Sequence, residues 1–199
     1  MQVPIELLVA IATFGFVTSV TPGPNNTYLL AAGANYGTRR SLRFVNGIML
    51  GLGTMLTAVW LGLGVVLASL PVLYQVLKYL GFAYILYLAY KVIISGYKPS
   101  TKEVDAPTFL KALGFQFINP KAWIVTTSFI ATYVPVGDGP GAFVWSLAIF
   151  LIFTYPGAVI WAAMGQGISK ILTNSKRRRV FNWVAGLLLI ASMLPALFI

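Results

Sequence analysis

Long stretches of this chain contain no charged residue, and they limit its fold more than any other feature of the sequence. The longest are Leu7–Thr38, Phe44–Leu77, Gly139–Ser169 and Val180–Ile199. Each equals or exceeds the roughly 20 residues that a helix needs to cross the hydrocarbon core of a bilayer. Only 9% of the residues are charged, whereas soluble domains carry about 25%. The sequence therefore predicts an all-α, polytopic membrane protein.

The apolar runs and the polar segments between them predict six transmembrane helices. The third contains Lys78 and Lys91, whose long side chains we expect to reach opposite headgroup layers. The first is too long for a secretory signal and lacks a basic n-region, so we expect it to be retained. The six predicted helices are Ile5–Ala34, Phe44–Leu70, Val72–Ser95, Phe109–Val134, Phe143–Ile168 and Val180–Phe198.

The basic residues gather after alternate predicted helices, and this asymmetry predicts the orientation in the membrane. Cytoplasmic loops carry an excess of lysine and arginine. The segments after the first, third and fifth helices are therefore predicted to be cytoplasmic, with both termini outside. These loops, rather than nucleic-acid binding, explain the net charge of +10. The opposite side holds only Lys78. The predicted cytoplasmic residues are Arg39, Arg40, Arg43, Lys91, Lys98, Lys102, Lys111, Lys170, Lys176, Arg177, Arg178 and Arg179.

The two halves of the chain have similar proline-containing interruptions in their first helices. This similarity predicts one membrane domain made of two inverted three-helix repeats. The repeats are approximately 1–95 and 108–199, joined by a cytoplasmic loop at 96–107. The first helix of each half is interrupted, by TPGPNN at 21–26 and by NPK at 119–121. Paired interruptions of this kind are typical of the binding sites of secondary transporters, so we interpret the chain as a transporter domain.

The prolines in these interruptions predict where each helix stops. Proline has no N–H group and clashes with the carbonyl four residues back. Pro22 is therefore expected to release the Thr18 carbonyl, and Pro120 the Gln116 carbonyl. Pro24 and Pro120 also suit the first position of a new half-helix. Such breaks are tolerated in a bilayer only against protein or a water-filled cavity, so we predict that the two breaks face each other near the midplane.

A small zwitterionic amino acid would suit a cavity between these two breaks. Free carbonyl groups attract its ammonium, while half-helix N-termini attract its carboxylate. Asn119 is a favoured N-cap, and Lys121 adds a positive charge, although a lysine at this depth can also simply extend to the headgroups. The predicted substrate-binding residues are Thr21, Pro22, Gly23, Pro24, Asn25, Asn26, Gln116, Asn119, Pro120 and Lys121.

Other conspicuous residues receive structural interpretations. The glycines of the second and fifth helices, including Gly47 and Gly51, are expected to let helices pack closely. Glu6 is interpreted as an interfacial residue, with a proton site as the alternative, and Trp161 and Gln166 are candidates for lining a cavity. With no cysteine, no histidine and only four acidic residues, the chain offers few catalytic or metal-binding groups. We therefore expect neither an enzyme nor a cofactor.

Three motifs carry a resemblance to a known family. They are TPGPNN at 21–26, GFAYILYLAYK at 81–91 and FQFINPKAW at 115–123. With them the chain resembles, over nearly its whole length, the LysE/RhtB family of bacterial amino-acid exporters. The resemblance implies export of amino acids or close derivatives across the inner membrane, driven by proton exchange. The family's shared motif residues correspond here to Pro22, Gly23, Pro24, Asn25, Asn119, Pro120 and Lys121.

Among the branches of that family, the chain looks most like the exporters of cysteine, O-acetylserine and other small neutral amino acids. Several members have an acid after a glycine pair in the second helix, but Gly51-Leu52-Gly53 is not followed by one here. This absence argues against a side-chain proton relay and against a basic substrate, whose charge would need a buried carboxylate. A passive amino-acid channel and an exporter of homoserine, threonine or basic amino acids stay open as alternatives, as do proton coupling and a homo-oligomeric state.

Overall fold

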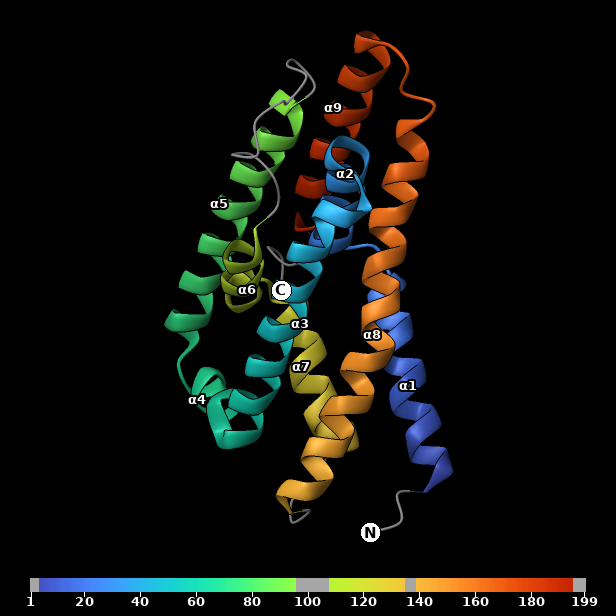
Figure 1. The fold of residues 1–199 in the computed structure, drawn as a ribbon. Coiled ribbons are helices and arrows are strands. Elements are labelled where there is room, and N and C mark those ends of the chain that lie inside the picture. Colours follow the sequence, from blue (N-terminus) through green and yellow to red (C-terminus); the bar gives the residue numbers. More distant parts are fainter. Residues whose placement is uncertain (1–3, 96–107, 135–138, 195–199) are drawn as a thin grey trace.

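The computed structural model describes residues 4–95, 108–134 and 139–194, and every regular element within these ranges is a helix. The prediction of an all-α protein is confirmed. The predicted loop at 96–107 and the last residues of the sixth predicted helix lie outside the described residues. The elements are α1 Ile5–Val20, α2 Pro24–Tyr36, α3 Thr38–Ala58, the π-helical turn η1 Val59–Leu63, α4 Gly64–Ser69, α5 Pro71–Ser95, α6 Phe109–Ile118, α7 Pro120–Tyr133, α8 Pro140–Ser169 and α9 Ser175–Ala191 (Figure 1).

Three of the described helices are long and apolar enough to cross a membrane, namely Thr38–Leu63, Gln75–Ser95 and Pro140–Ser169. A fourth span results if α1 and α2, which are bent by 60° at their break, are counted as one. The helices α6, α7 and α9 contain 10, 14 and 17 residues, fewer than the roughly 20 that cross a bilayer alone. These lengths support a polytopic membrane protein, while the six-helix topology stays a prediction.

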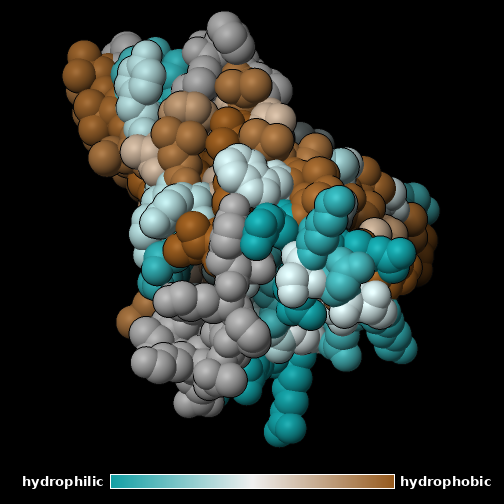
Figure 2. Space-filling view, turned by 90° about the horizontal axis from the view of Figure 1, so that it is seen from above, coloured by the Kyte–Doolittle hydropathy of each residue, from teal (hydrophilic) through white to brown (hydrophobic). Residues whose placement is uncertain are grey.

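Successive helices run in alternating directions along the long axis of the molecule (Figure 1). In that view α1 and α2 rise, α3 descends, α5 rises, α6 and α7 descend, α8 rises and α9 descends. The start of α3 and the start of α9 therefore lie at the same end, where hydrophilic side chains gather (Figure 2). This common end agrees with the predicted grouping of the basic residues. Which end faces the cytoplasm stays a prediction.

Two predicted helix boundaries are wrong, because basic residues assigned to loops lie inside helices. α3 begins at Thr38 rather than Phe44, and α9 begins at Ser175 rather than Val180. Gly37, with φ of 81°, turns the chain directly from α2 into α3. The Asn174 side chain caps α9 by accepting a hydrogen bond from the Arg177 amide at 2.8 Å. These basic residues thus belong to the first turns of α3 and α9.

The second predicted helix is also not continuous to Leu70. The chain changes direction at Gly62, whose φ of 104° favours glycine, before α4 begins at Gly64. The side chain of Lys78 on α5 is only 5% exposed, and its expected reach into a headgroup layer stays a prediction. Its ammonium lies 5.7 Å from the centre of the Tyr79 ring, a distance at which a cation and an aromatic face attract each other.

Each broken helix packs against a long helix of the other half of the chain. α1 and α2 lie along α8, and α6 lies along α3. Glycines on the long helices allow this close approach: a Cβ on Gly157 would overlap Ser19, and a Cβ on Gly47 would overlap the Phe109 carbonyl. At Gly51, a Cβ would lie 2.5 Å from Cγ of Gln116. The packing role predicted for these glycines is confirmed.

Candidate functional site

The first break separates α1 from α2 and is held by two side chains. Pro24 is at the start of α2, as predicted, and Gly23 before it is fully extended. Asn26, only 6% exposed, donates through Nδ2 to the Ser19 carbonyl at 2.6 Å and to the Thr21 carbonyl at 2.7 Å. The Thr21 hydroxyl donates to the Thr18 carbonyl at 2.8 Å. The expectation of a free Thr18 carbonyl is therefore wrong, because a neighbouring hydroxyl replaces the N–H that Pro22 lacks.

The second break separates α6 from α7 at a single residue. Asn119 is extended and caps α7, accepting a hydrogen bond on Oδ1 from the Lys121 amide at 3.1 Å, and Pro120 is the first residue of the new half-helix. These two assignments are confirmed. The Gln116 carbonyl, which was expected to be free, accepts the Asn119 N–H at 3.2 Å. A tight turn at the end of α6 thus replaces the bond that Pro120 cannot donate.

The two breaks are in direct contact through Lys121. Its Nζ lies 2.8 Å from the Thr21 carbonyl oxygen, 2.9 Å from the Thr21 hydroxyl and 3.2 Å from the Pro22 carbonyl oxygen. All three are hydrogen-bond distances for an ammonium donor. These residues are 99 and 100 positions apart in the sequence. The two breaks do face each other, while their place near the midplane stays a prediction.

A second contact joins the breaks in the reverse direction. Asn25 donates through Nδ2 to Oε1 of Gln116 at 2.9 Å, and Gln116 donates back through Nε2 to Oδ1 of Asn25 at 3.2 Å. Gln116 is fully buried and also donates to the Ala112 carbonyl at 2.9 Å. Asn25 and Lys121 each follow the proline that starts their half-helix. At both breaks, the residue after the proline therefore reaches across to the other break.

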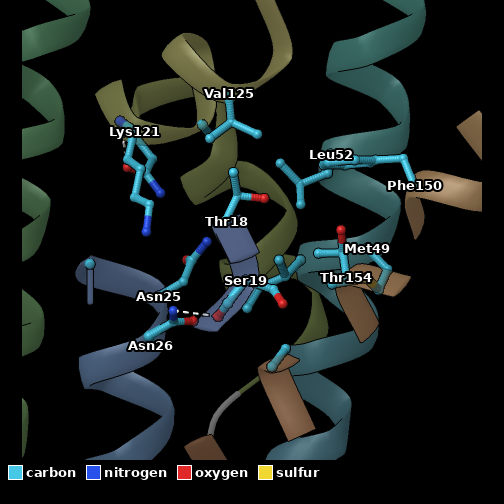
Figure 3. Close-up of a pocket in the computed structure, with 15 residues that line it drawn as sticks. Thr18, Ser19, Asn25, Asn26, Met49, Leu52, Lys121, Val125, Phe150 and Thr154 are labelled. Atoms are coloured by element: carbon cyan, nitrogen blue, oxygen red, sulfur yellow. Dashed lines mark hydrogen bonds between the residues drawn. The ribbon is translucent and has the colours of Figure 1, made fainter. Parts of the chain in front are cut away.

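A cavity of about 50 Å³ lies between these elements (Figure 3). Its walls come from the end of α1, from both breaks, and from α3, α7 and α8. Of the residues predicted from sequence, Gly23, Asn25, Asn26, Asn119 and Lys121 line it, and the other predicted residues do not. The lining residues that sequence reasoning missed are Thr18, Ser19, Ile48, Met49, Leu52, Ala122, Val125, Phe150, Thr154 and Ala158.

The cavity has a polar side and an apolar side. Amide and ammonium groups come from the two breaks and hydroxyl groups from the end of α1 and from α8, whereas Met49, Leu52, Val125 and Phe150 form an apolar wall. Among the residues that line it, Lys121 is the one charged side chain. A volume of about 50 Å³ holds a few water molecules. An amino acid would require side chains in the cavity to move.

Two other residues singled out from the sequence lie away from the cavity. Glu6 is exposed in the first turn of α1, as expected of an interfacial residue. Gln166 accepts the Thr38 N–H at 2.7 Å and so supports the turn between α2 and α3. Neither it nor Trp161 lines the cavity. In the part of the chain that the structure describes, no group of three or more acidic, cysteine or histidine residues is placed to hold a metal ion.

Comparison with known proteins matches the chain to one family and to several efflux proteins. Residues 16–193 match the profile of the LysE type translocator family. A cysteine/O-acetylserine efflux protein of Klebsiella pneumoniae is 34% identical over 190 residues, covering 92% of this chain and 93% of that protein. Proteins of the same description from Salmonella choleraesuis and Escherichia coli O139:H28 are 32% and 30% identical, each covering 92% of this chain and 94% of the relative. No solved structure matches significantly.

Proposed function

Because the chain belongs to the LysE type translocator family, we propose that it exports small neutral amino acids or close derivatives across the bacterial inner membrane. The observation that carries the proposal is that both helix breaks open on one cavity, which is lined by Gly23 and Asn25 from one break and by Asn119 and Lys121 from the other. The relatives described as cysteine/O-acetylserine efflux proteins support a substrate of this size and charge.

The polar side of the cavity matches the two charges of an amino acid. The N-termini of α2 and α7 carry the positive end of a helix dipole, which favours a carboxylate. Thr21 and Pro22 do not line the cavity, but their carbonyl oxygens hold the ammonium group of Lys121, which does. In the transporter, the substrate is held between these groups, with its α-carbon beside Asn25.

The apolar side of the cavity accounts for a small neutral side chain. Met49, Leu52 and Val125 offer hydrocarbon contacts and no charge. The side chain of lysine or arginine would lie there without a carboxylate partner, and an unpaired buried charge costs several kcal/mol, on the order of 3–5. The lining residues therefore favour cysteine, O-acetylserine, alanine or a similar substrate over a basic amino acid.

The arrangement of helices supports six transmembrane segments in two inverted repeats, approximately 1–95 and 108–199. In each proposed repeat, the first helix is broken and packs against the second helix of the other repeat. Pro24 and Pro120 occupy corresponding places, one residue before Asn25 and Lys121. Rocking of such repeats about a shared midplane site is the common mechanism of secondary transporters.

Counterflow in proteoliposomes tests this proposal. We expect vesicles containing the protein and loaded with unlabelled cysteine to accumulate labelled O-acetylserine, cysteine and alanine, but not labelled lysine or arginine. An imposed proton gradient should drive net uphill movement. Movement that only follows the amino-acid gradient would favour a passive channel, and a preference for lysine would contradict the neutral substrate class. Empty vesicles provide the control.

A further inference from the structure

An ammonium group already occupies the carbonyl oxygens of the first break. The Lys121 ammonium has three N–H donors and lies within 3.2 Å of three oxygens, the Thr21 carbonyl, the Thr21 hydroxyl and the Pro22 carbonyl. These partners satisfy the whole donor capacity of a primary ammonium. The α-ammonium of an amino acid has the same charge and the same three donors, so the same oxygens suit it equally well.

We propose that Lys121 is a tethered competitor for the position of the substrate ammonium and thereby selects α-amino acids over simple amines and simple acids. The inference rests on the proposed function and deepens it. When substrate enters, its ammonium takes the oxygens of Thr21 and Pro22. The displaced Lys121 then pairs with the carboxylate of the same substrate molecule. The charged groups exchange partners, and none is left unpaired.

Gly23 leaves room for the Lys121 side chain beside the first break. A Cβ on Gly23 would lie 2.8 Å from Cδ and 3.1 Å from Nζ of Lys121, so glycine at this position provides room for the lysine. The extended conformation of Gly23 is open to any residue, and room rather than backbone freedom is what glycine contributes. Both residues line the cavity. Figure 3 shows the Lys121 side chain reaching from α7 toward Asn25.

Selection follows from the loss of a charge-assisted contact at a site that is only partly shielded from water. An amine without a carboxylate would displace the Lys121 ammonium and leave it unpaired, because no other residue lining the cavity carries a charge. A carboxylic acid without an ammonium could attract Lys121 only by leaving the oxygens of Thr21 and Pro22 without a donor. Only a molecule that carries both charges replaces both contacts. Sites that reject a ligand by leaving polar groups unpaired discriminate strongly.

The test compares three ligands that share one side chain. Cysteine carries both charges, cysteamine lacks the carboxylate, and 3-mercaptopropionate lacks the ammonium. Each is measured as a competitor in binding to the purified full-length protein. We expect cysteamine and 3-mercaptopropionate to bind the unmodified protein at least about tenfold more weakly than cysteine, the effect of one lost charge-assisted contact. If counterflow selects alanine as the better substrate, ethylamine and propionate replace them.

The decisive variant is Lys121→Met. Without the competitor, cysteamine should bind more tightly than it does to the unmodified protein, while cysteine should bind more weakly because its carboxylate loses a partner. The affinity ratio of cysteamine to cysteine should therefore rise by about tenfold or more. Lys121→Gln, which can still donate to the carbonyls of the break, is a second variant and should shift the ratio in the same direction. Lys111→Met, at an exposed position on α6, is the matched control and should leave the ratio unchanged.

Two results would overturn the inference alone: cysteamine binding the unmodified protein as tightly as cysteine, or a ratio that Lys121→Met and Lys121→Gln both leave unchanged. The proposed function would survive either result, because cysteine still binds. If the unmodified protein binds neither cysteine nor any other amino acid, the proposed function fails and the inference fails with it.

Discussion

Replacing Asn26 by leucine is expected to lower the apparent unfolding midpoint of the protein by about 2–12 °C and to abolish transport. The Asn26 amide is a donor for the carbonyls of Ser19 and Thr21. Leucine of similar size would leave the Ser19 carbonyl without this donor, while the Thr21 carbonyl would keep the Lys121 ammonium. An unsatisfied buried polar group costs about 1–3 kcal/mol. For a chain of this length, 1 kcal/mol corresponds to about 2–4 °C. Thermal unfolding in detergent and counterflow in vesicles measure the two effects.

Asn46→Leu is the matched control for this prediction. Asn46 is an exposed asparagine on α3, whose side chain accepts a hydrogen bond from the Tyr155 hydroxyl at 3.2 Å. Its replacement should change stability by no more than about 0.5 kcal/mol. An Asn26→Leu variant as stable and as active as the Asn46→Leu variant would show that the amide does not hold the first break.

Removing both members of the Asn25–Gln116 pair is expected to destabilise the protein less than the sum of the two single changes. In Asn25→Leu or Gln116→Leu, the remaining amide keeps its polar groups but loses its partner, at a cost of about 1–3 kcal/mol. In the double variant both amides are replaced, so neither is left without its partner. We expect a coupling free energy of about 0.5–3 kcal/mol from the four unfolding measurements of the cycle.

Transport activity of the same variants provides a second measurement. Asn25 lines the cavity, whereas Gln116 does not. All variants that contain Asn25→Leu should therefore transport poorly, even where the second change restores stability. Asn174→Ala, which removes the distant cap of α9, should combine additively with Asn25→Leu. Additive losses for Asn25 and Gln116 themselves would mean that the two breaks are not coupled through this pair.

The positions of both helix breaks could be predicted from sequence because proline acts locally. Pro22 and Pro120 each cannot donate to the preceding turn, whatever the rest of the fold does. The partners of the freed carbonyls could not be predicted with the same certainty. Thr21 and Asn119 supply them at 2.8 Å and 3.2 Å, through a hydroxyl and a tightened turn that several alternative conformations would also allow.

The apolar wall of the cavity was missed because its residues carry no distinguishing chemistry. Met49, Leu52 and Phe150 resemble any other apolar residue of a membrane helix. Only the packing of α3 and α8 against the breaks brings them to the cavity. Gly51, whose missing side chain makes room for Gln116, was the one signal in the sequence near this wall. Gly51 was interpreted as a packing glycine, which is correct. The sequence could not show that the side chain packed against it is Gln116.

The start of α3 was predicted six residues late because its determinants lie far apart in the sequence. Thr38 donates its amide to Gln166 on α8, a contact across 128 positions. Three arginines nearby favoured a loop. Their charges are compatible with a helix that extends beyond the apolar layer, and long basic side chains on such a helix reach the polar region.

The most direct test of the central claim uses the fact that the chain contains no cysteine. A single cysteine at Val125, which lines the cavity from α7, should react with a maleimide several-fold more slowly when O-acetylserine is present. A single cysteine at the exposed Thr173, between α8 and α9, should react at the same rate with and without it. Equal rates at Val125→Cys in a variant that still transports O-acetylserine would place the substrate elsewhere and contradict a binding site between the two helix breaks.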